Sequence, residues 1–319
     1  MIGSVQEHGK PKSNFLPGDK PEWDLYSKCV HCGLCLDQCP TYRVLGTEMD
    51  SPRGRIYQIV QVDEGRLPLG EKFVTHIDRC LGCLNCQTAC PSGVPYAALL
   101  ERTRVQIAHQ YRRPWLQRVA RECFYLHVLP AARRLAFLAR LLRFYQRSGL
   151  QRILRASRLL NLLGLAEIEA LTPRIDNEFS FQDLGRVFPA NGPRRGRVAL
   201  LIGCISSVAF ADLNRATIRV LTQNGVEVYL PEAQSCCGAL HAHAGLLEQA
   251  RQQARRNVDG MLRPEFDAIL TNAAGCGSVL REYADLLGKD SQYADRAQQF
   301  VAKVRDVTEY LADLGLREP

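Results

Sequence analysis

The sequence predicts an α+β protein rich in helix: a helical, cysteine-rich part, an Arg/Leu-rich helical connector, and an α/β part with a mostly parallel sheet. Three observations predict this order. Eight cysteines gather near the N-terminus, arginines and leucines alternate after them, and the last third alternates short apolar runs with amphipathic segments. Such alternation is typical of strands and helices that build a mostly parallel sheet.

Composition divides the 319 residues into four expected segments. Residues 1–24 form a polar lead, 25–110 the cysteine-rich domain, 111–190 the connector and 191–319 the last domain, with a Pro/Gly/Arg-rich hinge at 188–196. Apolar residues make up 46% and charged residues 23%, which excludes a wholly disordered chain. Thirteen cysteines, mostly in motif-like groups, indicate metal ligation in a reducing compartment. Without an apolar run of spanning length or a signal peptide, we expect a cytoplasmic protein.

The net charge of +8 is concentrated in residues 101–160, which contain fourteen arginines and only two acidic residues, Glu101 and Glu122. Pro130 and Gly149 bracket a predicted helix. Its two expected faces are an apolar one with Leu135, Leu138, Leu142 and Tyr145, and a basic one with Arg133, Arg140, Arg143 and Arg147. A second amphipathic run covers 150–163.

This basic segment has two interpretations. Either the leucines pack on the protein's own core and the arginines meet an acidic partner subunit, which we favour, or the helices lie on anionic lipid at the inner face of the cell membrane. We expect no nucleic-acid partner, because the arginines alternate with leucines and aromatic residues are sparse.

In the last segment, residues 197–203, 226–230 and 267–271 are short apolar runs and are predicted as buried strands. Residues 209–223, 246–261 and 279–287 have the longer amphipathic pattern of helices. These six elements predict the mostly parallel sheet.

The strongest motif is a cysteine run that occurs twice. Residues 29–40 and 80–91 both read C-x2-C-x2-C-x3-C-P, the bacterial ferredoxin spacing for [4Fe-4S] clusters. Three cysteines of a run wrap one cluster, and the fourth, released by its proline, crosses to the other. We therefore expect a two-cluster ferredoxin-type domain with two ligand sets: Cys29, Cys32, Cys35 and Cys90 for one cluster, and Cys39, Cys80, Cys83 and Cys86 for the second.

Zinc is the alternative for this motif, because Cys-x2-Cys pairs also hold structural zinc. Zinc sites use four ligands in two pairs and have no use for a third spaced cysteine and a trailing Cys-Pro, so clusters are favoured. His31, inside the first run, is expected to be a loop residue because no cysteine is missing. Cys123 is expected to be a buried or interface thiol.

Clusters of this kind move single electrons, so the cysteine-rich domain is expected to conduct them. The sequence contains no G-x-G-x-x-G, Walker A, H-E-x-x-H or G-x-S-x-G motif. We therefore expect two-electron chemistry on another polypeptide, with no substrate oxidised by this chain alone.

A second group of cysteines occupies the last segment. Cys204 and Cys276 each follow a predicted strand, where open α/β sheets bind ligands, and Cys236 and Cys237 are adjacent. These four form a candidate third site, for a metal centre, zinc or thiol chemistry, which His241 and His243 are close enough in sequence to join. The alternative is that they are buried apolar side chains.

The chain resembles the iron-sulfur subunits of bacterial glycolate oxidase, within the larger family of two-cluster ferredoxin domains fused to cysteine-rich CCG domains. The resemblance rests on KCVHCGLCLDQCPTY, SPRGRIY, DRCLGCLNCQTACPSGVPY, SCCGALHAH and NAAGCGSVLREY. It implies an electron path from an FAD-binding partner that oxidises glycolate, or another 2-hydroxy acid, to a downstream acceptor. Subunits of lactate, glycerol-3-phosphate and heterodisulfide reductase systems share the layout and are the alternative.

Two departures from the family pattern bear on the third site. Family members usually carry a second CCG copy, so this chain is expected to be a shortened form or a fragment. The fullest motif ends in CxxC, whereas Val279 stands three positions after Cys276. A five-cysteine cluster and thiol-disulfide catalysis by this chain alone are therefore not expected.

Overall fold

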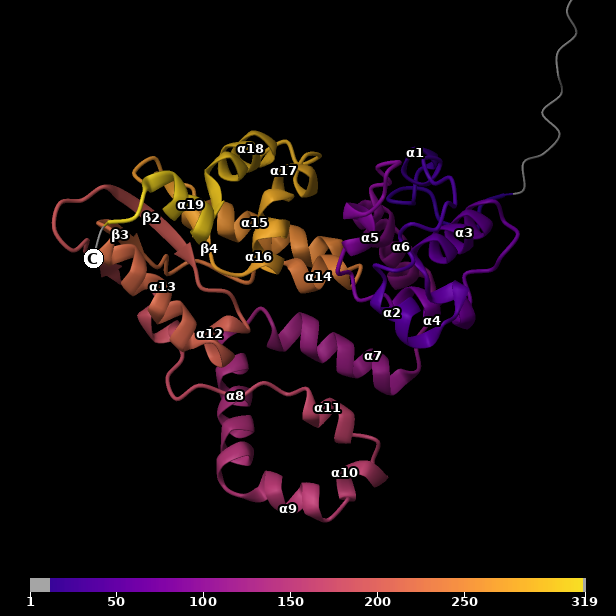
Figure 1. Ribbon diagram of the computed structural model, residues 1–319, viewed down its shortest axis with the longest axis horizontal. Coiled ribbons are helices and arrows are strands. Elements are labelled where there is room, and N and C mark those ends of the chain that lie inside the picture. Colours follow the sequence, from indigo (N-terminus) through magenta and orange to yellow (C-terminus); the bar gives the residue numbers. More distant parts are fainter. Residues whose placement is uncertain (1–11, 318–319) are drawn as a thin grey trace, which may run out of the picture. The chain divides into compact units, whose positions relative to one another are not determined.

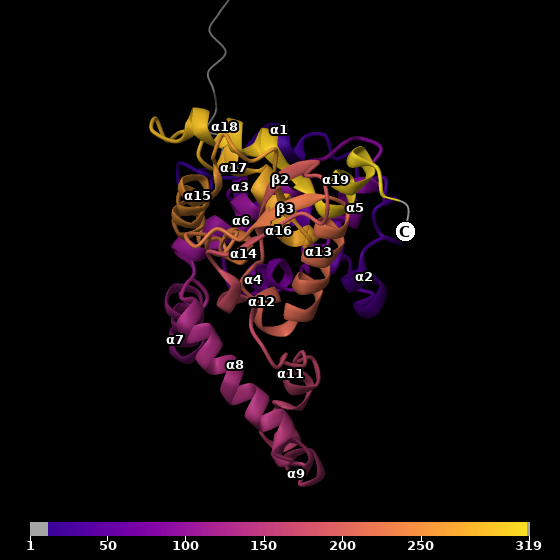
Figure 2. The ribbon, with the colours of Figure 1, turned by 90° about the vertical axis from the view of Figure 1, so that its left-hand side faces the viewer.

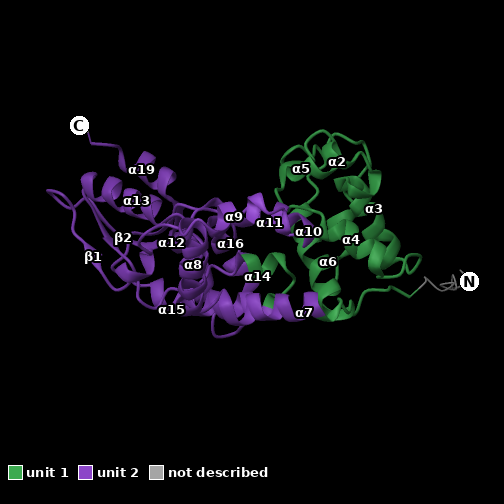
Figure 3. Ribbon diagram, turned by 90° about the horizontal axis from the view of Figure 1, so that it is seen from below, with its two compact units in different colours: residues 1–115, 240–247 green, residues 116–239, 248–319 purple. Residues whose placement is uncertain are grey.

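The structure is a computed structural model that describes residues 12–317 and divides into two compact units. One unit holds the chain up to Trp115 together with Leu240–Leu247, and the other holds Leu116–Ala239 and the chain from Glu248 onward (Figure 3). Residues 1–11 of the predicted polar lead lie outside the described residues. The predicted hinge at 188–196 lies inside the second unit, between β1 and β2.

The first unit is helical, as predicted. Its helices are α1 (Trp23–Tyr26), α2 (Pro40–Leu45), the short 3-10 helix η1 (Glu48–Asp50), α3 (Pro52–Asp63), α4 (Glu71–Asp78), α5 (Asn85–Thr88) and α6 (Tyr96–Gln110), and α14 (Ala239–His243) reaches into it. Buried side chains of α3, α4 and α6 form its core, among them Ile59, Ile77 and Leu99.

Local chemistry explains why two of these helices begin where they do. Pro40 and Pro52 occupy the first helical position of α2 and α3, where no N–H is needed. The Ser51 hydroxyl accepts a hydrogen bond from the Gly54 N–H and caps α3. A Cβ at Gly54 would lie 1.9 Å from the Glu48 carbonyl oxygen, so glycine lets α3 approach η1 closely.

The second unit contains the predicted sheet, with strands β1 (Val187–Phe188), β2 (Gly196–Leu201), β3 (Val226–Tyr229), β4 (Ala268–Thr271) and β5 (Val304–Asp306). Their order is β1-β3-β2-β4-β5, and every pair is parallel except β1 with β3. The strands predicted at 197–203, 226–230 and 267–271 are confirmed, and so is the mostly parallel sheet. The two-residue β1 and the three-residue β5 were not predicted, because runs this short carry no periodicity.

Helices cover both faces of this sheet (Figure 1). Val198 and Leu200 of β2 face a core shared with α13 (Ala211–Gln223) and α19 (Val307–Leu314), whereas Ala199 and Leu201 face the opposite core. That second core contains α15 (Leu247–Met261), α16 (Ala274–Arg281), α17 (Tyr283–Leu286) and α18 (Ala294–Lys303). Helix 246–261 is confirmed, while helix 279–287 starts earlier, at Ala274, and is interrupted at Glu282.

The connector is helical, with α7 (Trp115–Glu122), the π-helical turn η2 (Cys123–Val128), α8 (Ala132–Arg147), α9 (Leu150–Ala156), α10 (Leu159–Leu162) and α11 (Ala166–Ala170). The 3-10 helix η3 (Ser180–Asp183) and α12 (Ser206–Ala209) complete the unit. Within it, α8 runs away from the sheet toward α9 (Figure 2). The run predicted at 150–163 is broken at Arg158, whose φ of 56° no α-helix accepts.

The faces of α8 differ from the prediction. Leu135, Ala136 and Ala139 pack against Ile175, Phe179 and Val208, but Leu138 is exposed. Arg140 and Arg143, expected on the outer face, lie over the Phe179 ring. Apolar side chains face outward instead: Phe137, Leu138, Leu141 and Phe144, continued on α9 to α11 by Leu150, Ile153, Leu159, Leu162 and Ile168. Leu135 and Leu142 face the core as predicted, and Arg133 and Arg147 are exposed as predicted. The helix also has a second, exposed apolar stripe, so the prediction that its outer face is basic throughout is wrong.

Candidate functional site

The first three cysteines of the first run and the last two cysteines of the second run line one pocket. Its cysteines are Cys29, Cys32, Cys35, Cys86 and Cys90, and the rest of the wall is largely apolar, including Val30, Ile56, Pro91 and Val94. The run wraps the pocket because Gly33 adopts a φ of 87° and His31 a φ of 54°. These turns allow cysteines only three positions apart to line the same pocket.

The second pocket, of about 290 Å³, is lined by Cys39, Cys80, Cys83 and Cys86, together with Pro40, Pro52, Arg55, Leu81, Leu84 and Tyr96. Cys39 lies with the second run and Cys90 with the first, so the fourth cysteines of the two runs exchange pockets. Cys86 lines both pockets, which therefore adjoin.

The cysteine side chains suit a cluster in geometry and chemistry. Within residues 12–317, no three His, Cys, Asp or Glu side chains converge as they would on a single metal ion. A [4Fe-4S] cluster binds one thiolate per iron, so its ligands line a cage instead of meeting at a point. Two largely apolar pockets, with five and four thiols in their walls and Cys86 common to both, fit that requirement.

Burial keeps several of these thiols protonated in the absence of metal. It raises the pKa of the Cys86 thiol to about 12. Burial also raises the pKa of Cys29 and of Cys35, although backbone N–H groups of His31 and Arg53 act against it. Since the thiolate is the metal ligand, cluster assembly must release these protons.

The four cysteines of the second unit are gathered by the sheet. Cys204 follows β2, Cys276 lies in the first turn of α16 after β4, and Cys236 and Cys237 are buried between them. The Cys204 thiol donates to Cys236 Sγ at 3.5 Å, and the Gly238 N–H donates to the same sulfur at 3.5 Å. The cysteines expected to form a third site are thus brought together.

Hydrogen bonds among these sulfurs shift the pKa values of the thiols in opposite directions. The bond from Cys204 to Cys236, and then burial, raises the pKa of Cys204. The bonds of Cys237 to Cys236 and Cys276, and then burial, raise the pKa of Cys237. The bond from Cys237 lowers the pKa of Cys276, although burial opposes this. Cys276 is therefore the most acidic thiol whose pKa moves in this group.

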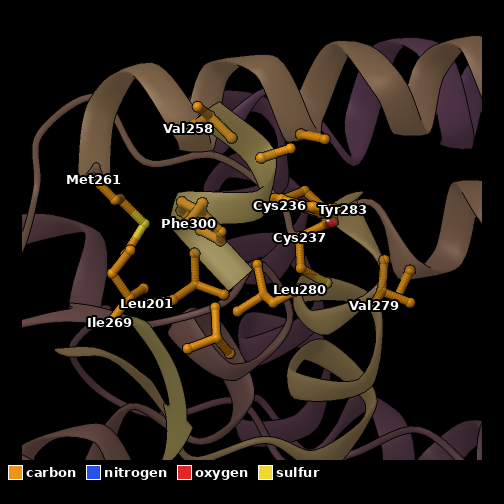
Figure 4. Close-up of a cluster of buried hydrophobic side chains, with 14 of the residues drawn as sticks. Leu201, Cys236, Cys237, Val258, Met261, Ile269, Val279, Leu280, Tyr283 and Phe300 are labelled. Atoms are coloured by element: carbon orange, nitrogen blue, oxygen red, sulfur yellow. Dashed lines mark hydrogen bonds between the residues drawn. The ribbon is translucent and has the colours of Figure 1, made fainter. Parts of the chain in front are cut away.

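Buried polar side chains hold the backbone of the cysteine pair. The Tyr283 hydroxyl donates to the Cys237 carbonyl at 2.7 Å, and Asn257 Nδ2 donates to the Cys236 carbonyl at 3.0 Å. Figure 4 shows Cys236, Cys237 and Tyr283 together among buried apolar side chains. Cys204 and Cys236 also line a pocket of about 650 Å³ that includes Gln234 and Arg256.

The remaining candidates lie elsewhere. His243 Nδ1 is 3.0 Å from Glu101 Oε1 within the first unit, and His241 is buried in that unit. His31 is a loop residue, as expected, whose carbonyl accepts from Arg53. Cys123 is exposed, which leaves only the interface half of its predicted role.

Sequence reasoning missed a buried polar cluster beside Cys39. Arg55 and Asp50 are 1% and 0% exposed, and Arg55 Nη1 lies 3.9 Å from Cys39 Sγ. The sequence signal was SPRGRIY, in which the buried Arg55 follows the more exposed Arg53 by two positions. Nothing in that spacing says which arginine turns inward.

Three segments of the chain match known protein families. Residues 26–94 match 4Fe-4S dicluster domains, 116–172 match the linker region of the glycolate oxidase iron-sulfur subunit, and 198–281 match cysteine-rich domains. Together with the fold, they define a protein that joins an iron-sulfur dicluster domain to a cysteine-rich α/β domain.

Relatives that match nearly the whole chain identify the family more closely. The probable glycolate oxidase iron-sulfur subunit of Bacillus subtilis (strain 168) is 37% identical over 294 residues, which is 91% of this chain and 66% of that protein. The glycolate oxidase iron-sulfur subunit of Escherichia coli (strain K12) is 34% identical over 324 residues, covering 100% of this chain and 72% of that protein. This chain belongs to the family of glycolate oxidase iron-sulfur subunits.

More distant similarity reaches lactate utilization protein A of Halalkalibacterium halodurans, which is 28% identical over 118 residues, 37% of this chain and 48% of that protein. No solved structure matches the chain. Within the described residues, no helix is both long and apolar enough to cross a membrane.

Proposed function

We propose that this chain is the electron-transfer subunit of a flavin-dependent glycolate oxidase or dehydrogenase complex. It accepts electrons from an FAD-binding partner that oxidises glycolate and passes them to a downstream acceptor. The observation that carries the proposal is that eight cysteines line two adjoining pockets that share Cys86. When bound, two [4Fe-4S] clusters supply one-electron carriers at short range.

The chain's own residues have separate tasks in this proposal. Cys29, Cys32, Cys35 and Cys90 hold one cluster, and Cys39, Cys80, Cys83 and Cys86 hold the other. Apolar side chains such as Ile56, Val94 and Leu84 limit the access of water to the two pockets. Cys32 and Cys83 are exposed, so electrons enter and leave at these two edges.

Reduction by substrate tests this function. The chain purified with its FAD-binding partner should lose cluster absorbance when glycolate is added under anaerobic conditions. The chain alone should not, because the proposal places hydride removal on the FAD-binding partner. Bleaching of the chain alone by glycolate, or none in the complex, would contradict the proposal.

Lactate is the second candidate substrate, favoured by the similarity to lactate utilization protein A. Adding lactate and glycerol 3-phosphate to the same complex separates the alternatives. Faster bleaching by lactate than by glycolate would move the assignment to a lactate system.

The cysteines of the second unit remain the candidate third site. The two-cluster proposal expects about eight irons per chain after anaerobic purification, with Cys204, Cys236, Cys237 and Cys276 free or holding zinc. About twelve irons would put a third cluster there and favour a role of the heterodisulfide reductase type.

The partner docks, in our proposal, on the exposed apolar and basic surface of α8 to α11. This surface combines aromatic and leucine side chains with exposed arginines, a composition typical of protein interfaces. The double variant Phe137→Ser/Phe144→Ser should weaken binding of the flavoprotein while iron content is retained. The matched control is Val44→Ser, an exposed apolar residue of the first unit.

Peripheral attachment to the inner face of the cell membrane is the alternative use of the same surface, since amphipathic basic helices also bind anionic lipid. Co-sedimentation with vesicles rich in anionic lipid distinguishes the two. Sedimentation that requires Phe137 and Phe144 would favour the membrane, and its absence with intact flavoprotein binding would favour a cytoplasmic complex.

A further inference from the structure

The two cysteine-lined pockets have different electrostatic surroundings, and the difference begins on one helix. Arg53 and Arg55 both lie in the first turns of α3, yet Arg53 lines the first pocket and Arg55 the second. Gly54 stands between them and allows α3 to approach η1, which carries Asp50. One short motif therefore supplies one guanidinium to each pocket.

Arg55 is fully buried and directed at a cysteine. Its Nε donates to the His76 carbonyl at 2.7 Å and its Nη2 to Thr41 Oγ1 at 3.1 Å, while Nη1 lies 3.9 Å from Cys39 Sγ. Thr41 Oγ1 is itself 3.2 Å from Cys39 Sγ. These contacts hold the Arg55 guanidinium in one orientation beside Cys39 Sγ.

The carboxylate that accompanies Arg55 is shared among several groups. Asp50 Oδ1 accepts from Arg55 at 3.5 Å and lies 3.0 Å from His76 Nδ1, and Asp50 Oδ2 accepts from Arg79 at 3.1 Å. One negative charge thus faces two guanidinium groups. Arg55, which lines the second pocket, therefore belongs to a cluster in which two guanidinium charges face one carboxylate.

The arginine of the first pocket is neutralised in comparison. Arg53 forms a two-pronged pair with Glu48, through Nε at 2.7 Å and Nη2 at 3.3 Å. The side chains of this pair are 31% and 41% exposed, so water screens what field remains. Buried charges in a low-dielectric interior act far more strongly than exposed pairs.

We propose that Arg55, held by Asp50, raises the reduction potential of the cluster at Cys39, Cys80, Cys83 and Cys86 above that of the other cluster. This inference rests on the proposed ligand sets. An added electron increases the negative charge of a cluster, and a buried guanidinium beside one of its sulfurs stabilises that charge. The Tyr96 hydroxyl lies 3.7 Å from Cys80 Sγ and can donate to that sulfur when it is a thiolate. Electron transfer from the cluster of the first pocket to that of the second is therefore favourable.

Reduction potentials of the two clusters test this directly, by electron paramagnetic resonance during an anaerobic redox titration of the complete chain. Arg55→Gln should reduce the ratio of reduced to oxidised second cluster about tenfold at a fixed potential, a shift of about 59 mV for one electron. Arg55→Lys should recover part of the shift, because it keeps the charge but loses the planar fork.

Two further variants separate electrostatics from structure. Arg79→Gln removes a half-exposed positive charge bound to the same carboxylate, and should shift the second cluster in the same direction by about threefold. Arg53→Gln, on the same helix, is the matched control and should leave the second cluster unchanged.

The outcomes distinguish this inference from the proposed function. Fewer than two clusters in the unaltered chain would overturn both. Two clusters whose potentials respond to neither Arg55→Gln nor Arg79→Gln would overturn the inference alone. Loss of iron in Arg55→Gln with unchanged potentials in Arg79→Gln would also overturn it and make Arg55 a structural residue.

Discussion

The two cysteine groups of this molecule are built in opposite ways. In the first unit, eight cysteines line two pockets, most of them on loops whose shape comes from local spacing and positive φ angles. In the second unit, four cysteines from three separate segments meet at the ends of parallel strands and hydrogen-bond to each other. The thiols of the first group line pocket walls, whereas the sulfurs of the second group are hydrogen-bonded within the protein.

The contrast teaches that cysteine proximity alone does not identify a cluster site. Cys204 and Cys236 are closer together than a cage requires, with their sulfurs at 3.5 Å. The pocket that Cys204 and Cys236 line also contains apolar and polar side chains such as Leu129 and Gln234. We therefore expect the two groups to respond differently when single side chains are removed.

Removal of single cysteines from the two groups should give the largest effect. Cys32→Ala and Cys83→Ala each remove a thiol from one pocket only, so each variant should lose about four of about eight irons per chain. Cys236→Ala should keep about eight. Iron and acid-labile sulfide analysis measures this, with the exposed Cys123→Ala as control. Equal iron loss from Cys83→Ala and Cys236→Ala would abolish the distinction between the groups.

A smaller effect is expected when the support of the buried cysteine pair is removed. Asn257 accepts from the Ser235 N–H at 2.8 Å and donates to the Tyr283 hydroxyl at 2.9 Å, besides its bond to Cys236. Asn257→Ala leaves these buried partners unsatisfied and should lower the free energy of unfolding by about 2–4 kcal/mol. The exposed Gln252→Ala on the same helix should change it by less than about 0.5 kcal/mol.

Chemical denaturation followed by circular dichroism measures this difference. If the cysteines of the second unit are held by protein contacts, the loss should be the same with and without iron in the first unit. A loss that appears only after iron removal would mean that a metal helps to hold these cysteines too.

The smallest expected effect is the pH dependence of the stabilisation that Asp63 gives to the first unit. Burial raises the pKa of Asp63, but hydrogen bonds from Tyr26, Ser13 and Lys20 outweigh it and leave that pKa below its usual value. The ionised form is therefore favoured by folding, and its stabilisation is present at neutral pH and lost as pH falls through the lowered pKa.

Asp63→Asn should remove this contribution, about 1 kcal/mol at pH 7. The difference in unfolding free energy between the unaltered chain and the variant should shrink as the pH is lowered below about 5. Denaturation midpoints at several pH values measure it. A difference that stays constant down to acidic pH would show that the carboxylate charge does not contribute.

Much of the fold was predictable because it rests on local patterns. The three long strands have continuous apolar runs, and the helix over residues 246–261 has a clear amphipathic period. The outward face of α8 was not predictable, because leucines and aromatic residues occur on both of its sides and only tertiary packing against Phe179 selects one. The break at Arg158 likewise depends on a single backbone conformation that no composition announces.

The sequence by itself determined the chemistry of this protein. Two copies of the ferredoxin cysteine run predict which residues are ligands and that the fourth cysteines exchange pockets, because cluster geometry requires these intervals between the cysteines. Tertiary structure alone decided the surroundings of those ligands. The choice of Arg55 over Arg53 as the buried guanidinium depends on α3, α4 and η1 packing together. A charge acts according to its burial and its partners, and no residue interval encodes either.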